Sequence, residues 1–211
     1  MSHFPVILSA PSGGGKTTIA RRLLETRPDT GYSVSCTTRK PRAGEIEGKD
    51  YYFKSPAEFK AARERGEFAE SATVHGDLYG TLRSEVDRVL GSGKHVIMDI
   101  DVQGARQFAE VFPQTVLIFI VPPSLTSLLE RLKVRATEDK ASLSRRLSDA
   151  HDELEALDFY QYVVVNDNLG TAVQSVSSII DAESLKRSRG GEITGRVKAR
   201  SEEHTSELQS R

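Results

Sequence analysis

The chain has 211 residues and a formal net charge of −1 at pH 7, and 37% of its residues are apolar and 28% charged. This length suits one compact domain with insertions, which buries most of its apolar surface on folding. The near-neutral charge provides no global field to attract nucleic acid or an anionic membrane, so we expect neither as a partner.

The cysteine content and the apolar runs favour a cytoplasmic protein. Cys36 is the only cysteine, which excludes an internal disulfide and fits a reducing compartment. We interpret it as a small, semi-buried apolar residue. Every apolar run is far shorter than the ~20 residues of a membrane span. Residues 1–4 lead straight into a strand-like run, so a cleavable signal peptide is not expected.

A strand, a glycine-rich turn and a helix are predicted at the start of the chain. The apolar run FPVILSA (4–10) precedes the turn, and TTIARRLLETR (17–27), with apolar residues at helical spacing, follows it. Between them, SAPSGGGKTT (9–18) fits the phosphate-loop pattern G-x-x-x-x-G-K-[ST], except that Ala10 replaces the first glycine. Because a strand precedes the turn and a helix follows it, we predict a nucleoside triphosphate site.

Each part of such a loop has a chemical role. Several backbone N–H groups and the helix dipole converge on a phosphate. Lys16 would reach the β- and γ-phosphates, and the Thr17 hydroxyl would bind Mg²⁺. The methyl group of Ala10 is the smallest possible addition to the pattern, and we expect it to be tolerated if the backbone there has φ below zero.

A polar, turn-rich segment from Ser33 to Leu82 interrupts the pattern of strands and helices. Its one helix is predicted to start at Pro56, with Ser55 as the cap and Glu58 three residues after the cap. We interpret this segment as a small insertion domain that carries a second substrate site.

Two arginines in this insertion suit a phosphate monoester. Arg39 and Arg42 flank Lys40 and Pro41, and Tyr51 follows. Paired guanidinium groups on a turn that proline stiffens, together with a tyrosine hydroxyl, match the oxygens of such a group. A basic surface loop is the alternative interpretation.

Three later apolar runs predict buried parallel strands, at 94–101, 115–122 and 162–167. Helical patterns at 125–135 and 142–157 lie between the last two runs. This alternation predicts an α/β fold with a parallel sheet.

Two acidic residues, Asp99 and Asp101, close the first of these runs. A carboxylate at the carboxyl end of a parallel strand, beside a phosphate loop, suits a ligand of Mg²⁺-bound water. We interpret Asp101 as lining the site, or alternatively as a helix cap, and Asp99 as structural or as supporting the site indirectly, behind the residues that touch the ligand. DVQG (101–104) also fits the D-x-x-G pattern of GTPases. However, NDNL (166–169) lacks the lysine and the final aspartate of a guanine-reading motif, which disfavours a GTPase.

The remaining segments are polar. Residues 135–146 begin and end in arginine and form either a solvated connector or a mobile lid that carries cations toward phosphates. Residues 186–199 are basic and predict a disordered tail. Residues 200–211 read as an in-frame translation of a sequencing-library adapter, and we interpret them as an artefact outside the fold.

Together these motifs resemble the guanylate kinase family, nucleoside monophosphate kinases that move the γ-phosphate of ATP to GMP. The matching segments follow the family order within residues 4–185: SAPSGGGKTT, SVSCTTRKPRAGEIEGKDYYF, GEFAESATVHGDLYGT, VIMDIDVQGA, RRLSDAHDEL and VVVND. The resemblance implies a three-layer P-loop α/β core with a parallel sheet (1–33 and 83–185), a small mixed α+β GMP-binding insertion (34–82) and a helical lid (135–148).

The resemblance also implies roles for individual residues. ATP contacts are expected from Ser12, Gly13, Gly14, Gly15, Lys16, Thr17, Thr18 and Asn166. GMP contacts are expected from Ser35, Glu70, Thr81 and Asp101, and at its phosphate from Arg39, Arg42, Tyr51 and Tyr79. The expected catalytic cations are Lys16, Arg131, Arg135 and Arg146. Thr17 is the expected protein ligand of Mg²⁺, together with ATP phosphates and water.

The expected reaction needs no general base, because the GMP phosphate is already ionised at neutral pH. His75 and His95 are therefore interpreted as structural or surface residues. A catalytically inactive, protein-binding relative is the main alternative, but its phosphate loop would be expected to be broken. Another small-molecule kinase would not explain Ser35, Glu70 and Tyr79 together. The sequence leaves open whether the chain is a monomer or a homo-oligomer.

Overall fold

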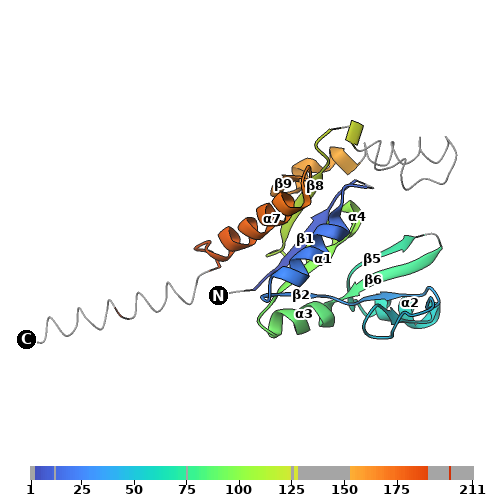
Figure 1. The fold of residues 1–211 in the computed structure, drawn as a ribbon. Coiled ribbons are helices and arrows are strands. Elements are labelled where there is room, and N and C mark those ends of the chain that lie inside the picture. Colours follow the sequence, from blue (N-terminus) through green and yellow to red (C-terminus); the bar gives the residue numbers. More distant parts are fainter. Residues whose placement is uncertain are drawn as a thin grey trace, which may run out of the picture.

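A parallel five-stranded sheet forms the centre of the molecule (Figure 1). The computed structural model describes residues 3–11, 13–74, 76–124, 126–127, 153–189 and 200. The strand order is β2-β7-β1-β8-β9, and every neighbouring pair is parallel. The strands are β1 (Pro5–Ser9), β2 (Thr30–Tyr32), β7 (His95–Asp99), β8 (Val116–Val121) and β9 (Tyr162–Val165).

Helices cover both faces of this sheet, which confirms the three-layer α/β core. On one face lie α1 (Lys16–Thr26) and α7 (Leu169–Ser184), and on the other lie α3 (Arg83–Gly91) and α4 (Val102–Val111). Successive side chains of a strand point to opposite faces, so a strand buried on both faces must be apolar throughout. In β1, for example, Val6 and Leu8 pack toward α1 and α7, whereas Ile7 packs toward α3 and α4.

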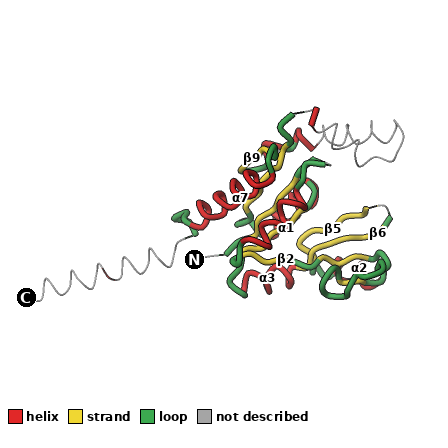
Figure 2. The backbone as a smooth tube through the Cα atoms, in the orientation of Figure 1, coloured by secondary structure: helices red, strands yellow, loops and turns green. Residues whose placement is uncertain are grey.

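The insertion folds as a second, four-stranded sheet with one helix (Figure 2). Its strand order is β4-β3-β6-β5, from β3 (Ser35–Thr37), β4 (Tyr52–Phe53), β5 (Phe68–Val74) and β6 (Asp77–Leu82). β6 is antiparallel to both of its neighbours, and β3 and β4 are parallel. A mixed α+β unit is therefore present where the sequence predicted one.

Helix α2 (Pro56–Glu64) begins where its sequence signal placed it. The Ser55 hydroxyl accepts the Glu58 backbone N–H at 3.2 Å, and the Glu58 carboxylate accepts the Ser55 N–H at 2.8 Å. The helix covers one face of the second sheet, where Cys36, Phe59 and Phe68 form a small apolar core. Cys36 is fully buried, and burial raises the pKa of its thiol to about 11. The thiol therefore stays protonated near neutral pH and packs as a small apolar side chain.

A buried carboxylate joins the two sheets. Glu85 of α3 is 6% exposed, and it accepts the phenol O–H of Tyr52 at 3.1 Å and the backbone N–H of Val34 at 3.4 Å. Val34 lies in the segment that enters the second sheet, and Tyr52 belongs to that sheet. Arg88 donates two hydrogen bonds to the same carboxylate. Glu85 thus connects the core helix to the insertion.

The residues after α7 correct one expectation. Residues 186–189 were expected to begin a disordered tail, but Lys186 and Arg189 both form ion pairs with Glu183, which is 2% exposed. The Arg189 guanidinium also lies 4.0 Å from the centre of the Phe4 ring. A buried acid and an aromatic face therefore hold this basic segment against the core.

The described residues omit most of the segment between β8 and β9. The predicted helices at 125–135 and 142–157, and the predicted lid at 135–148, lie largely or wholly outside them. Among the residues that the structure describes, no helix has the length and apolar character needed to cross a bilayer.

Candidate active site

The turn between β1 and α1 leads into the helix through glycine, which has no side chain to cap the first backbone N–H groups. Gly13 and Gly15 adopt left-handed φ values of 84° and 94°, and the Gly14 N–H donates to the Pro11 carbonyl at 2.7 Å. Gly15 precedes the first residue of α1 and provides no capping hydrogen bond. The first N–H groups of a helix carry a partial positive charge, so this end of α1 suits a phosphate.

The position of Ala10 explains why its departure from the glycine pattern is tolerated. Ala10 is 2% exposed, and a Cβ added at Gly14 would lie 2.7 Å from the Ala10 Cβ. The methyl group therefore occupies space that glycine at position 14 leaves open. A side chain is accommodated at one of these two positions but not at both.

Asn166, which follows β9, lies under the phosphate loop. Its amide nitrogen donates to the Gly14 carbonyl at 2.9 Å, and a Cβ at Gly15 would approach the same nitrogen to 2.3 Å. The residue is 7% exposed. The structure thus assigns Asn166 to support of the loop, while its expected contact with adenine stays a prediction.

The oxygens of Thr17 and Asp99 lie together beside the loop. Asp99 ends β7, which is adjacent to β1 in the sheet, and the Thr17 hydroxyl donates to its carboxylate at 2.5 Å. Hydroxyl and carboxylate oxygens are the donors that Mg²⁺ prefers. Within the described part of the chain, no group of three or more acidic, histidine or cysteine side chains forms a metal cage.

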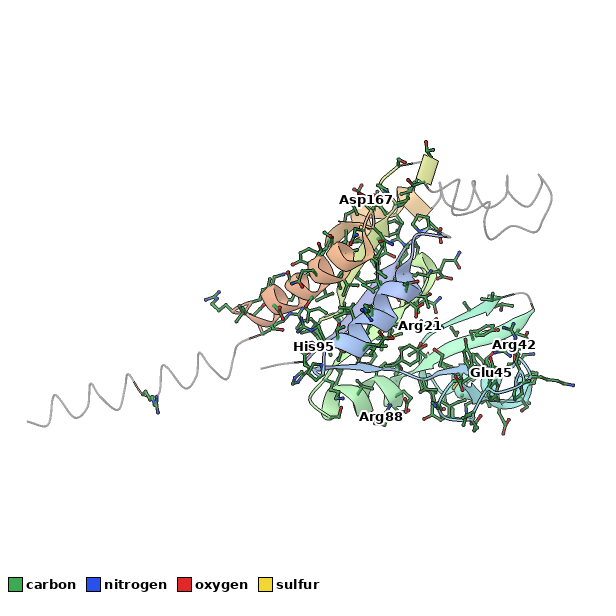
Figure 3. The ribbon with its side chains drawn as sticks, viewed as in Figure 1. Arg21, Arg42, Glu45, Arg88, His95 and Asp167 are labelled. Carbon is green, nitrogen blue, oxygen red and sulfur yellow. The ribbon has the colours of Figure 1, made fainter. Side chains whose placement is uncertain are left out.

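A cavity of about 780 Å³ lies between the core and the second sheet. Thr17, Asp99 and Asp101 line its core side, and Ser35, Glu70 and Tyr79 line its other side. Figure 3 shows Arg21 on α1 at the core side, and Arg42 and Glu45 in the insertion. Thr17, from the segment predicted to bind a phosphate chain, therefore lines the same cavity as three residues predicted for a second substrate.

Sheet register brings three predicted residues into one row. Ser35 on β3 and Glu70 on β5 are both register partners of Thr81 on β6, which lies between them. Directly opposed residues share a face of a sheet. The Thr81 hydroxyl donates to the Glu70 carboxylate at 2.6 Å. The row consists of two hydroxyls and one acid on the face opposite α2.

Glu70 lies in an environment that disfavours its charge. It is 8% exposed, and burial raises the pKa of its carboxyl above the usual range; the Thr81 hydrogen bond opposes this shift and the nearby Asp101 adds to it. A buried carboxylate whose second oxygen faces a cavity gains most from a ligand that donates hydrogen bonds.

Asp101 both caps a helix and lines the cavity. Its carboxylate accepts the Gly104 N–H at 2.7 Å and so caps α4, and the residue also lines the cavity. A Cβ at Gly104 would lie 3.3 Å from a Glu70 oxygen and 3.4 Å from an Asp101 oxygen. The absence of a side chain at Gly104 lets the two acids of different sheets approach the same space.

The predicted phosphate-monoester residues gather at the turn between β3 and β4. The Arg39 guanidinium lies 5.4 Å from the centre of the Tyr51 ring, and the Tyr51 and Tyr79 rings are 6.1 Å apart. Arg39 forms two hydrogen bonds with Glu45, whereas the Arg42 side chain is exposed. Sequence reasoning did not single out Glu45, although an acid three residues after Arg42 in a turn with two arginines was a usable signal.

Comparison with known proteins identifies the family. The family model described as guanylate kinase matches residues 2–183. The chain belongs to the guanylate kinase family. It is 45% identical to a guanylate kinase of Nitrosomonas europaea over 87% of this chain and 91% of the relative. It is also 45% identical to a guanylate kinase of Thermotoga maritima, over 91% and 93% of the two chains.

A solved guanylate kinase shares the fold. The crystal structure of guanylate kinase from Anaplasma phagocytophilum matches with a TM-score of 0.70 and 36% sequence identity, and 89% of each chain is covered. The family resemblance read from the sequence is thereby confirmed.

Several residues expected from the guanylate kinase family lie outside the described chain, namely Ser12, Arg131, Arg135 and Arg146. Other cavity residues were missed by sequence reasoning, among them Arg21, Tyr32 and Ser33. Ser33 is 2% exposed, and its hydroxyl has no hydrogen-bond partner among the described residues. No periodicity or motif marks these positions, because only the folded chain brings α1 and the start of the insertion together.

Proposed function

We propose that the protein transfers the γ-phosphate of ATP to GMP, giving ADP and GDP. The observation that carries this proposal is the cavity lined by Thr17 and Asp99 on the core side and by Ser35 and Glu70 on the other, where the buried Thr81 hydroxyl supports Glu70 from behind. A phosphate-binding turn and a polar, partly acidic recognition surface facing one cavity suit transfer between two bound nucleotides.

The row on the second sheet has the chemistry to select guanine. Guanine presents N–H donors at N1 and N2 and an acceptor at O6, so Glu70 would accept from both nitrogens while Ser35 donates to O6; the Thr81 hydroxyl already donates to Glu70. Adenine presents an acceptor at N1, which would leave the Glu70 carboxylate without a donor from the ligand. An unpaired buried charge costs about 1–3 kcal/mol or more, so the acid would disfavour adenine strongly.

Cations would supply most of the catalysis. The GMP phosphate is already an oxyanion, and the barrier arises from bringing two polyanions together and from charge on the transferred group. Lys16 and the backbone of the loop would hold the donor phosphates, and Arg39, Arg42, Tyr51 and Tyr79 the acceptor phosphate. Arg131, Arg135 and Arg146 are proposed as further cations from a lid that excludes water.

Mg²⁺ would be held by Thr17, with Asp99 placed to accept from a water of its shell. Bound there, the ion would neutralise charge on the donor phosphates. Thr18, Gly13, Gly14 and Gly15 are proposed to complete the ATP site, and Asn166 to hold the loop in shape. The lone cysteine favours the cytoplasm as the place of action.

An ADP-release assay with ATP and Mg²⁺ tests the proposal when GMP, AMP, CMP and UMP are offered in parallel. We expect turnover with GMP, and in Glu70→Ala a rise of about 10-fold or more in KM for GMP, the loss that a buried hydrogen-bonding site implies. Nucleotide binding without turnover for any acceptor would instead support a protein-binding module. Preference for another monophosphate would overturn the guanine assignment.

A further inference from the structure

Glu45 holds one end of the Arg39 guanidinium. Its Oε1 accepts from Nη2 of Arg39 at 2.7 Å, and its Oε2 accepts from Nη1 at 3.0 Å. The Arg39 side chain is 14% exposed and the Glu45 side chain 20%. Among the described residues, no other carboxylate forms an ion pair with Arg39. Such a two-bond pair fixes the plane of the guanidinium as well as its position.

The same carboxylate is built into the turn that carries Arg42. Oε2 of Glu45 also accepts the backbone N–H of Arg42 at 2.7 Å, and the Glu45 N–H donates to the Arg42 carbonyl at 3.1 Å. These contacts hold the pKa of the Glu45 carboxyl below its usual range, with Arg39 as the largest cause. Movement of the Glu45 carboxylate away from Arg39 would therefore also break its hydrogen bond to the Arg42 N–H in this turn.

The pairing leaves one edge of Arg39 for an anion. Nη1 of Arg39 donates to Glu45 and to the Lys40 carbonyl, and Nη2 donates one N–H to Glu45. The side edge, formed by Nε and the second N–H of Nη2, meets no carboxylate among the described residues; another polar side-chain neighbour of the guanidinium, besides Glu45, is the uncharged hydroxyl of Tyr79. Arg39 lies against Tyr51, and Tyr51, Tyr79 and Glu45 all line the cavity.

We infer that Glu45 is a positioning residue for the acceptor phosphate: it stays bound to Arg39 and directs the remaining N–H edge of that guanidinium toward the phosphate. The inference rests on the proposed function, because the acceptor phosphate is that of GMP. A carboxylate beside an anion site is otherwise unfavourable, since like charges repel. The presence of Glu45 is explained if holding the flexible Arg39 side chain in place favours phosphate binding by more free energy than the repulsion between Glu45 and the phosphate opposes it.

Calorimetric titration of the full chain with GMP and with guanosine tests the inference. In Glu45→Gln we expect GMP to bind about tenfold more weakly, as for loss of a charge-assisted hydrogen bond, whereas guanosine, which lacks the phosphate, binds within about twofold of wild type. In the kinase assay KM for GMP should rise while KM for ATP stays unchanged.

Glu47→Gln is the matched control. Glu47 lies in the same turn and its carboxylate accepts the Phe53 N–H, so the substitution removes the same charge without touching Arg39. We expect no selective loss of GMP binding. In an Arg39→Gln background, Glu45→Gln should change GMP affinity by less than about twofold, because the group that it positions is gone.

Each other outcome overturns the inference. Unchanged or tighter GMP binding in Glu45→Gln would mean that Glu45 only occupies the phosphate position and is displaced. An equal loss for guanosine and GMP would mean a general structural role. Wild-type binding and turnover of GMP report separately on the proposed function: if wild type fails, that function fails, whereas a normal wild type beside a normal Glu45→Gln removes only this inference.

Discussion

A substitution at Gly104 is expected to affect GMP binding and the stability of the fold in opposite directions. It lies in the first turn of α4, where alanine favours the helix by up to about 1 kcal/mol. The added Cβ, however, would lie 3.3 Å from a Glu70 oxygen, so that carboxylate must move by a few tenths of an ångström. For Gly104→Ala we expect an unchanged or higher free energy of unfolding in urea, together with a several-fold higher KM for GMP.

Gly91→Ala provides the comparison for this substitution. Gly91 is the last residue of α3, and an added Cβ there would meet no atom within 4 Å. It should raise stability without any change in KM for GMP. If Gly104→Ala also leaves KM unchanged, the approach of α4 to Glu70 has no part in acceptor binding.

The raised pKa of Glu70 predicts a pH dependence of base recognition. In the proposed site only the ionised carboxyl of Glu70 can accept both guanine N–H groups, and burial raises the pKa of that carboxyl. Guanosine affinity should therefore fall as pH is lowered, with a midpoint above the ~4.3 of an ordinary glutamate. Guanosine is the ligand for this titration because a phosphate monoester itself titrates near pH 6. A Glu70→Gln variant should show a flat profile; the same slope in that variant would assign the titration to another group.

Strand β7 contains a histidine that should make the core sensitive to mild acid. His95 is 4% exposed, its Nδ1 accepts the Phe4 N–H at 3.3 Å, and burial lowers its pKa to about 4. Between pH 6.5 and 4 the unfolded chain binds a proton that the folded chain does not, so stability falls as pH falls through this window. From pH 7 to pH 5 we expect a loss of about 1–2 kcal/mol in the free energy of unfolding.

Urea unfolding of His95→Gln checks the source of this loss. The variant should be less stable at pH 7, because its packing against Phe4 changes, but its stability should vary less between pH 7 and pH 5. The acids whose pKa values are lowered in the fold, such as Asp29 and Glu85, lose their contribution only at lower pH. An equal pH slope in His95→Gln would show that His95 is not the responsible group.

The elements that the sequence predicts well are those with a local signal. Continuous apolar runs indicated β1, β7, β8 and β9, because strands covered by helices on both faces require apolar residues at every position. The capping box located the start of α2. By contrast, the short strands of the insertion depend on pairing between distant segments, and their register appeared only in the fold.

The site residues divide in the same way. The phosphate loop carries its own motif, and family motifs pointed to Ser35, Glu70 and Thr81, which the register then brought into one row. Glu45 and Glu85 were missed because their importance lies in partners such as Arg39 and Tyr52 rather than in their own surroundings in the sequence. The ordered segment at 186–189 was missed because its charges are paired with a buried acid.

Several polar contacts join the core of the molecule to the second sheet. Glu85 ties α3 to Val34 and Tyr52, and the Gln107 side chain of α4 accepts the Ser71 N–H of β5 at 3.1 Å. Both contacts lie in elements beside the cavity and hold the second sheet against α3 and α4. Ala69 of β5 also packs into the apolar cluster under α3 and α4, so the joint combines hydrogen bonds with an apolar contact.

Tyr52→Phe tests the joint at Glu85 by removing one hydroxyl while keeping the ring in place. Loss of this hydrogen bond should cost about 1 kcal/mol. Because the bond links α3 to β4, amide hydrogen exchange should accelerate in β3 and β4 more than in β1 and β8. KM for GMP should rise and KM for ATP should not, since the lost hydrogen bond loosens only the insertion, where GMP is proposed to bind.

Arg88→Gln is the comparison for this substitution. The Arg88 side chain is 58% exposed and pairs with Glu85 within α3, so exchange in β3 and β4 should stay near wild type. If both variants accelerate exchange equally, Glu85 stabilises α3 and does not join the two units.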